Sequence, residues 1–288
     1  MRVAVLSDIH GNYIALESCI EEIQRRNIDK IIFLGDYVGE LAYPQRTMAL
    51  IRSIEKNYEC YFVRGNKEDY WIHYKNNRKT EWKDHDSTTG SLLYTYNNLT
   101  SEDISFFESL PYMKEICYTE MPVLAAYHGS HDKNGKKLKL NTNQEEVLFQ
   151  DTDAPVILCG HTHIRAEIKQ DGQILLNPGS VGVPLKSNGK SQFMILTGNN
   201  GIWSYEFIDL PYDIEKVICE LKEEDLYTKA PCWSKITENL LRNGDISHGT
   251  VLERAMQYLY NDTGEWRWPD IPEEYWEKAV EELIGNRC

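Results

Sequence analysis

The sequence predicts an α/β fold in which buried strands alternate with amphipathic helices. Short continuous apolar runs, such as RVAVLS at 2–7, are typical of strands buried on both faces. The segments that follow them show the periodicity of helices with one apolar face. With 288 residues and a hydrophobic share of 41%, the chain is long enough to bury a large core.

The first 65 residues predict the parallel part of the fold. After RVAVLS comes a helical stripe of Leu16, Ile20 and Ile23, and the later runs KIIFLG and CYFVRG are separated by a helical segment around 45–55. A β-α-β-α-β order of this kind favours a largely parallel sheet with right-handed crossovers.

The rest of the chain divides into an insertion, a second group of strands and a helical extension. Residues 70–115 are polar and aromatic and then helical in pattern, and residues 211–288 are helical, acidic and contain several tryptophans. We expect a core over 1–210 that contains this insertion, and a helical cap over 211–288. Further strands are expected at 122–127, 154–159, 172–176 and 192–196, the last of which begins a hairpin that turns at GNNG, 198–201.

Composition excludes several classes of partner. The net charge of −14 argues against a nucleic-acid backbone or an anionic membrane. The seven cysteines are odd in number and form no C-x-x-C pair, which favours a reducing cytoplasm over a disulfide framework or a thiolate zinc site. No apolar stretch approaches the roughly 20 residues of a membrane span, and no signal-peptide core is present. We therefore expect a soluble cytoplasmic protein.

Residues of the types that bind transition metals come directly after the predicted strands. The carboxyl ends of parallel strands form one edge of a sheet, where ligand sites are found, so these side chains should converge. Mixed imidazole and carboxylate donors suit Mn, Fe, Zn or Co, and seven donors suit two ions that share a carboxylate. Two such ions create an electropositive centre that favours a phosphate. The seven residues are Asp8, His10, Asp36, Asn66, His128, His161 and His163.

Five ordered motifs resemble the calcineurin-like metallophosphoesterase superfamily, in particular its small prokaryotic branch of phosphodiesterases and dinucleoside-polyphosphate hydrolases. They are D-x-H at 8–10, G-D at 35–36, G-N at 65–66, H-G at 128–129 and G-H-T-H at 160–163, within about residues 1–205. NPGSVG at 177–182 resembles a further turn of that branch. The resemblance implies a four-layer α/β (α+β) architecture with a central β-sandwich flanked by helices.

The resemblance also implies how the ligands are shared between two divalent transition-metal ions. Manganese is the first expectation, with Fe, Zn, Co or Ni as others. A metal-bound hydroxide would attack phosphorus while both ions polarise the phosphoryl oxygens, with Asn66 and His128 near the substrate. One ion would be held by Asp8, His10 and His163, and the other by Asn66, His128 and His161, with Asp36 bridging.

Two motifs depart from patterns within the superfamily. Many members carry G-N-H-[DE], whose histidine lies near the leaving group, but here that position is Lys67. A lysine with a pKa of about 10.4 is a poor general acid, although it can act as a fixed positive charge in catalysis. Substrates with good leaving groups are therefore favoured. Gly39 and Glu40 stand where phosphoprotein phosphatases have Asp and Arg, which disfavours that activity.

The favoured substrate is thus a nucleotide phosphoanhydride such as a dinucleoside polyphosphate, a phosphorylated small molecule rather than a nucleic acid. A phosphodiesterase and a serine/threonine phosphoprotein phosphatase are the enzymatic alternatives. A protein-binding scaffold is the alternative of another class, as in the retromer subunit that shares this architecture. A homo-oligomer is compatible with the sequence.

Four neighbouring polar residues allow two interpretations each. Asn12 precedes a helix, so it is either an N-cap or a substrate contact. Arg64 fits a surface or supporting role better than phosphate binding, and His131 either lines the cleft or is an ordinary loop histidine. Glu68 is expected to support the ligands rather than to react.

Overall fold

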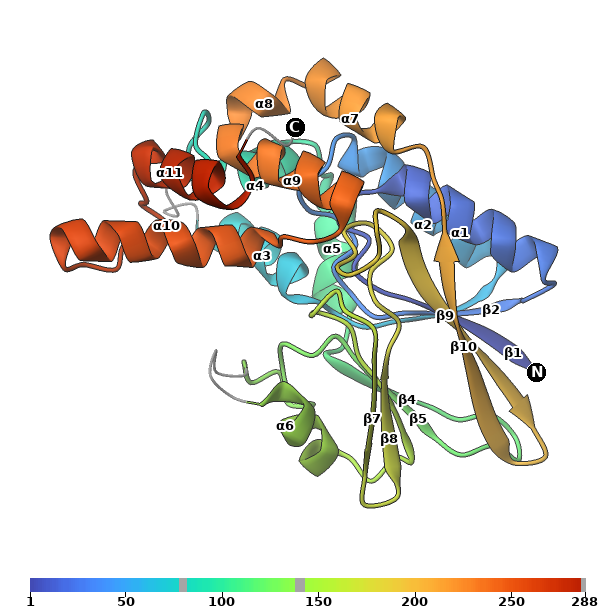
Figure 1. The fold of residues 1–288 in the computed structure, drawn as a ribbon. Helices are drawn as coiled ribbons and strands as arrows, with labels where there is room; N and C mark the ends of the chain where they lie inside the picture. The colour runs from blue at the N-terminus through green and yellow to red at the C-terminus, as the bar shows by residue number, and fades with distance from the viewer. Residues whose placement is uncertain (78–81, 138–142, 286–288) are drawn as a thin grey trace.

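Two five-stranded sheets form the centre of the structure, a computed structural model that describes residues 1–77, 82–137 and 143–285 (Figure 1). The first sheet has the order β10 (Ile202–Leu210), β9 (Ser191–Asn199), β1 (Arg2–Leu6), β2 (Lys30–Phe33) and β3 (Glu59–Phe62). The second has the order β4 (Met113–Ile116), β5 (Leu124–Tyr127), β6 (Val156–Leu158), β8 (Gln173–Asn177) and β7 (Ala166–Gln170).

Each sheet combines three parallel strands with antiparallel neighbours. Strands β1, β2 and β3 are parallel, as are β5, β6 and β8. The hairpin of β9 and β10 joins β1 in antiparallel pairing, and β4 and β7 are antiparallel edges of the second sheet. The parallel β-α-β-α-β order is confirmed, and so is the hairpin.

The two sheets pack face to face, which confirms the β-sandwich. Strand β1 shows the alternation that this packing requires, because successive side chains of a strand point to opposite faces. Val3 and Val5 belong to the cluster between the sheets, together with Leu124 and Leu158 of the second sheet. Ala4 and Leu6, on the other face of β1, pack against helices instead.

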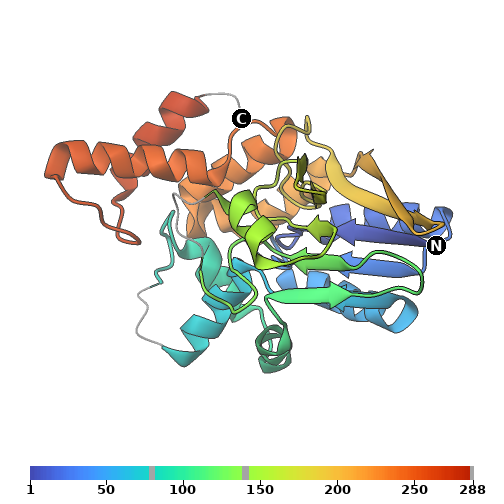
Figure 2. The same cartoon turned by 90° about the horizontal axis from the view of Figure 1, so that it is seen from below.

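Helices pack on the outer face of the first sheet, and one short helix packs on the second (Figure 2). On the first sheet these are α1 (Tyr13–Arg25) and α2 (Pro44–Asn57), and Leu16, Ile20 and Ile23 of the predicted stripe are all buried in that layer. Helix α6 (Gln144–Asp151) packs on the second sheet through Leu148 and Phe149. The insertion contains α3 (Asn66–Asn76), α4 (Gly90–Asn97) and α5 (Ser101–Ser109), and residues 78–81 within it lie outside the described residues.

The C-terminal segment is helical, as predicted, and packs against the first sheet's helices and the insertion (Figure 1). Val217 and Leu240 share a buried cluster with Tyr13 and Leu41. Trp276 is fully buried and its Nε1 donates to Thr88 Oγ1 at 3.0 Å. The segment's helices are α7 (Ile214–Glu223), α8 (Leu226–Lys229), α9 (Pro231–Asn243), α10 (His248–Thr263) and α11 (Glu273–Leu283).

Two short strands were not predicted. Strand β4 begins at the end of 70–115, where the sequence pattern predicted helix, and extends to Ile116, and β7 lies in a segment given no secondary structure. Both are edge strands, and the side chains of β7 are half-buried or exposed, so neither presents the apolar run that marks a buried strand.

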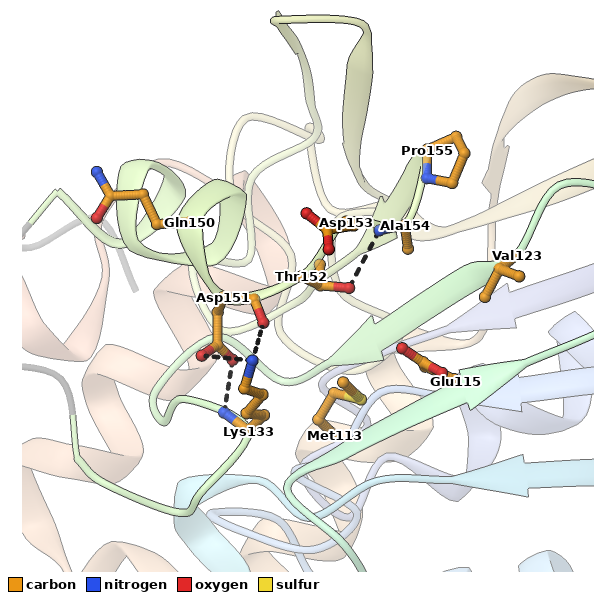
Figure 3. Close-up of a pocket in the computed structure, with 10 residues that line it drawn as sticks. All are labelled: Met113, Glu115, Val123, Lys133, Gln150, Asp151, Thr152, Asp153, Ala154 and Pro155. Atoms are coloured by element: carbon orange, nitrogen blue, oxygen red, sulfur yellow. Dashed lines mark hydrogen bonds and ion pairs between the residues drawn. The ribbon is translucent and has the colours of Figure 1, made fainter.

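A surface hollow lies between α6, β4 and the residues before β6 (Figure 3). Lys133 lines it and donates its backbone N–H to Asp151 Oδ2 at 2.7 Å. None of the seven candidate ligand residues lines this hollow. Among the described residues, no helix has both the length and the apolar composition needed to cross a bilayer.

Candidate metal centre

The candidate ligands converge between the carboxyl ends of strands from both sheets. Asp8 and His10 follow β1, Asp36 follows β2, and Asn66 begins α3 after β3. His128 follows β5, and His161 and His163 follow β6 in the second sheet. The sequence pattern predicted one sheet edge, whereas the structure builds the centre from two.

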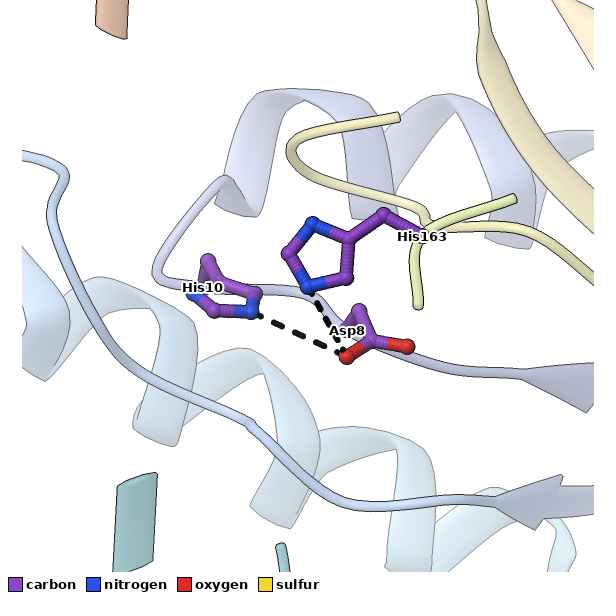
Figure 4. Close-up of side chains that lie close together, drawn as sticks. All are labelled: Asp8, His10 and His163. Atoms are coloured by element: carbon purple, nitrogen blue, oxygen red, sulfur yellow. Dashed lines mark ion pairs between the residues drawn. The ribbon is translucent and has the colours of Figure 1, made fainter. Parts of the chain in front are cut away.

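The first group comprises Asp8, His10 and His163, whose ligand atoms lie within 4.8 Å of one another (Figure 4). His163 Nε2 is 3.2 Å and His10 Nε2 is 3.8 Å from Asp8 Oδ1. Asp8 Oδ1 and His10 Nε2 are buried and have no hydrogen-bond partner. A buried polar atom without a hydrogen-bond partner destabilises the folded state. Two such atoms directed at the same point therefore fit a cation bound between them.

The second group is centred on His128. Its Nε2 lies 3.4 Å from Asp36 Oδ2, 3.1 Å from Asn66 Oδ1 and 3.3 Å from His161 Nδ1. Asp36 Oδ2 is also 3.4 Å from His10 Nε2 in the first group. One oxygen of Asp36 therefore faces both groups, which is the position that a bridging carboxylate needs.

Each aspartate is oriented by hydrogen bonds to one of its two oxygens. Asp8 Oδ2 accepts from Ser7 Oγ at 2.5 Å and from the backbone N–H of His161 at 3.0 Å. Asp36 Oδ1 accepts from the backbone N–H of Lys67 at 2.9 Å. The other oxygen of each carboxylate is left to face the centre.

Two histidines are oriented through their Nδ1 atoms. Nδ1 of His128 lies 2.7 Å from the Leu34 carbonyl oxygen, and Nδ1 of His163 lies 3.1 Å from the Val183 carbonyl oxygen. A carbonyl oxygen only accepts, so Nδ1 carries a proton in both rings, including the neutral form that binds a metal. This fixes the tautomer and turns Nε2 toward the centre, as is usual for metal-binding histidines.

The third histidine, His10, uses a carboxylate in the same way. Its Nδ1 lies 2.6 Å from Glu40 Oε2, and both side chains are buried. The position of Glu40 was noted in the sequence only as a departure from the phosphatases. Its contact with His10 depends on the folded loop after β2, for which sequence spacing offers no signal.

Five of the seven residues have backbone conformations that only glycine adopts freely. A non-glycine residue with positive φ stores roughly 1–3 kcal/mol of strain when the surrounding structure holds it there. Strain of this kind concentrated in one place indicates that the fold pre-organises the site. The φ angles are 54° for Asp8, 51° for His10, 54° for Asp36, 69° for His161 and 58° for His163.

Glycines allow the motif loops to approach the aspartates. A Cβ on Gly160 would lie 1.9 Å from Ser7 Oγ and 2.6 Å from Asp8 Oδ2. A Cβ on Gly65 would lie 2.1 Å from Asp36 Oδ1. All three distances are too short for any side chain, so these glycines are required for close packing.

Burial and mutual attraction set the charge of the centre. Burial disfavours charge on Asp8, but His163, His10 and His128 hold the pKa of that carboxyl well below its usual range. Asp36 is likewise buried, and His128 and His10 lower its pKa to about 2. Burial also lowers the pKa of the imidazoles, yet Glu40 and Asp8 raise that of His10 to about 10, and Asp36 raises that of His128 to about 9.

The candidate ligands differ in their exposure to solvent. Asp8, His10, Asp36 and His128 are at most 2% exposed, whereas Asn66, His161 and His163 are half-buried. A ligand would therefore approach past the half-buried residues, because the others are covered by the two sheets and their loops.

Glu68 supports the loop that carries Asp36, as expected. Its carboxylate accepts the backbone N–H groups of Asp36 at 3.0 Å, Tyr37 at 2.9 Å and Gly65 at 2.8 Å. Burial and the nearby Asp36 raise the pKa of Glu68 to about 7. The residue thus joins the loops that follow β2 and β3.

Lys67 points away from the solvent and forms an ion pair with Glu40. Only 9% of the residue is exposed. The sequence led us to predict that its ammonium group contacts the phosphate or leaving group, and that contact stays a prediction. In the structure the ammonium group lies against Glu40, the partner of His10.

The three predicted substrate contacts have protein partners. Asn12 is the N-cap of α1, accepting from the Ala15 N–H at 3.0 Å and donating to Gly182 O at 3.0 Å. Arg64 donates to Glu108 O at 2.6 Å and to the Tyr112 hydroxyl at 3.3 Å. His131 is buried, and its Nε2 lies 3.2 Å from Asp69 Oδ2. The N-cap interpretation of Asn12 is confirmed, and substrate contacts by all three stay predictions.

Known proteins resemble this chain in sequence and fold. A family model described as the calcineurin-like phosphoesterase superfamily domain matches residues 1–201. The uncharacterized protein MJ0912 of Methanocaldococcus jannaschii is 28% identical over 249 residues, which cover 80% of this chain and 94% of that protein.

Two crystal structures share the fold. One is a metallophosphoesterase from Sphaerobacter thermophilus, with a TM-score of 0.60, 22% identity, and coverage of 80% of this chain and 99% of that one. The other is the hypothetical protein PH1004 from Pyrococcus horikoshii OT3, with a TM-score of 0.70, 21% identity, and coverage of 85% and 99%. The family model spans well over half of the chain, and the chain therefore belongs to the calcineurin-like phosphoesterase superfamily. The superfamily depends on two metal ions; the unpartnered donors of the first group fit one such ion, and the donors that converge around His128 and Asp36 fit a second.

Replacement of Gly160 by alanine tests the close packing around Asp8. The added Cβ would collide with Ser7 and Asp8, so Gly160→Ala should lower the free energy of unfolding by about 1–3 kcal/mol and reduce the number of ions bound per chain. Thermal unfolding and metal analysis after dialysis measure both effects. Gly249→Ala in α10 is the matched control, because its Cβ would meet no atom closer than 3.7 Å. Normal metal content in Gly160→Ala would contradict this account.

Metal loading should release protons. The pKa values of about 10 for His10 and about 9 for His128 mean that both imidazoles are charged at pH 7 without metal. A metal binds the neutral imidazole, so its affinity should rise as the pH rises toward those values. Titration calorimetry at pH 7 in buffers of different ionisation enthalpy gives the number of protons released. A count near zero would contradict the proposed charge state.

Proposed function

We propose that the protein is a dinuclear metal-dependent phosphoesterase that hydrolyses a phosphate ester or anhydride, with a nucleotide phosphoanhydride such as a dinucleoside polyphosphate as the favoured substrate. The observation that supports this most directly is the convergence of seven donors from two sheets. In particular, Asp36 Oδ2 lies 3.4 Å from the Nε2 atoms of both His10 and His128. Membership of the phosphoesterase superfamily supports the same proposal.

The chain's own residues prepare the site for a phosphate. Bound at the two groups, divalent ions would supply Lewis-acid polarisation of phosphoryl oxygens and lower the pKa of water. Asn66, His161 and His163 are the half-buried ligands, so the substrate would enter past their side chains. Left-handed backbone conformations and hydrogen bonds to Asp8 and Asp36 hold the ligands in place, so little reorganisation is needed when substrate binds.

The environment of Lys67 supports a substrate with a good leaving group. Burial disfavours its charge, but Glu40 raises the pKa of Lys67 above the ordinary lysine value. Such an ammonium group gives up its proton poorly near neutral pH, and general-acid catalysis contributes typically 10²–10⁴-fold. An alkoxide leaving group needs that contribution, whereas a nucleotide phosphate leaves without it. This difference favours phosphoanhydrides over alkyl phosphates.

Hydrolysis of diadenosine tetraphosphate by the manganese-loaded protein tests the proposal. We expect kcat/KM for this anhydride to exceed that for an alkyl phosphodiester or an alkyl phosphomonoester by roughly 10²-fold or more, the size of a missing general-acid contribution. Chromatography of the products shows whether the cleavage is asymmetric, giving ATP and AMP, or symmetric, giving two ADP.

The control variants separate the metal centre from general effects. Asp36→Asn should abolish turnover, while Asp171→Asn, at an exposed turn between β7 and β8, should not. A preference for alkyl esters would contradict the anhydride assignment and favour a phosphodiesterase or a phosphatase. No turnover of any phosphate compound with two ions bound would contradict the enzymatic function and favour a protein-binding scaffold.

A further inference from the structure

A buried chain of contacts connects His10 to the C-terminal helices. Glu40 Oε2 lies 2.6 Å from His10 Nδ1, and Glu40 Oε1 forms the ion pair with the Lys67 ammonium group. Lys67 Nζ in turn lies 5.8 Å from the ring centre of Trp233, at the start of α9. This series of contacts thus connects a candidate metal ligand to a residue more than 200 positions away in sequence.

Glu40 and Lys67 form a unit inside the protein. They are 5% and 9% exposed, respectively. Removing one member of a buried ion pair leaves the other charge without compensation, so neither can be replaced without disturbing its partner. The backbone N–H of Lys67 also donates to Asp36 Oδ1 at 2.9 Å, which ties the same residue to the bridging carboxylate.

The C-terminal helices hold Trp233 over this pair. The Trp233 ring stacks on His248 of α10 with 4.4 Å between centres and 23° between planes. The Thr237 hydroxyl donates to the Trp233 carbonyl oxygen at 2.8 Å and lies 2.8 Å from His248 Nε2. Since the hydroxyl proton is already used, His248 Nε2–H is the donor of the second bond. These contacts hold the Trp233 indole in place at the end of the series of contacts that begins at His10.

The indole has a physical effect on the pair that it covers. The face of an aromatic ring attracts a nearby cation, and the Lys67 side chain is only 11% exposed to water. Exclusion of water strengthens the attraction between the two charges, because the local dielectric is lower. A firmly held Glu40 in turn fixes the His10 ring with Nε2 toward Asp8 and Asp36.

We propose that Glu40 and Lys67 are positioning residues for His10, and that Trp233 of the C-terminal segment completes their enclosure. The ion at Asp8, His10 and His163 then depends on helices α9 and α10. Lys67 acts through Glu40 rather than on the substrate. This inference rests on the proposed metal centre but not on the identity of its substrate.

Metal-binding measurements on Glu40→Gln, Lys67→Met and Trp233→Ala test the proposal. Mutation of the residues that orient a metal ligand typically costs 10–100-fold in metal affinity. We expect each variant to lower the affinity for one of the two ions by roughly this factor in manganese titration calorimetry. The affinity for the other ion should be unchanged. Trp233→Phe keeps an aromatic ring over Lys67, so it should restore most of the affinity that Trp233→Ala loses.

Reference variants identify which ion is affected. His10→Ala and His161→Ala each remove a candidate ligand from one group, and the positioning variants should resemble His10→Ala. The Glu40→Gln/Lys67→Met double variant should bind the metal no more weakly than the single variant with the lower affinity, because the two residues act as one unit. Lys30→Met removes the exposed Lys30–Glu59 ion pair and is the matched control, with both affinities unchanged.

Several outcomes would overturn the proposal. Unchanged dissociation constants for both ions, even with a lower unfolding temperature, would mean that the residues are only structural. An equal loss of affinity for both ions would indicate general damage to the site rather than a loss of His10 positioning. Because Trp233 is half-buried and lies outside the ion pair, its variants keep the test valid if Lys67→Met fails to fold.

The experiment also separates this inference from the proposed function. If the wild-type protein hydrolyses no phosphate compound and the variants lose one ion, the positioning role is supported and the proposed function is contradicted. Conversely, an active wild type with variants that retain both ions would support the function and contradict the positioning role.

Discussion

The structure depends on keeping two buried carboxylates close together with one oxygen of each directed at a common centre. Asp8 and Asp36 are at most 2% exposed, and burial alone would drive both toward the neutral form. The imidazoles of the centre offset this cost without metal, and cations would offset it more fully. Most of the unusual local geometry follows from this one constraint.

The loops around the aspartates show how the constraint is met. Glycine at 65 and 160 lets neighbouring loops approach within distances that any Cβ would block. Glu68 collects three backbone N–H groups and fixes the loop of Asp36 against the loop of Gly65. The two sheets then contribute ligands from opposite layers, so neither sheet alone can form the centre. Stability of the sandwich and integrity of the site are therefore linked.

Much of this arrangement could be predicted from the sequence because its signals are local. Apolar runs located β1, β2 and β3, and the seven donors follow strand ends at motif spacings. Strands β4 and β7 were missed because short edge strands lack an apolar run. The direction of the Lys67 side chain could not be predicted, since it depends on Glu40, 27 residues earlier, and on Trp233 in a distant helix. Contacts of that range are decided by tertiary packing, which periodicity does not report.

The most direct test of the central claim is the location of the ions in crystals grown with manganese, by anomalous scattering. The account predicts two peaks separated by about 3.5–4 Å, the spacing of two-metal sites, with Asp36 between them. One peak should lie against Asp8, His10 and His163, and the other against Asn66, His128 and His161. A single peak, or two peaks that do not share Asp36, would contradict the dinuclear centre.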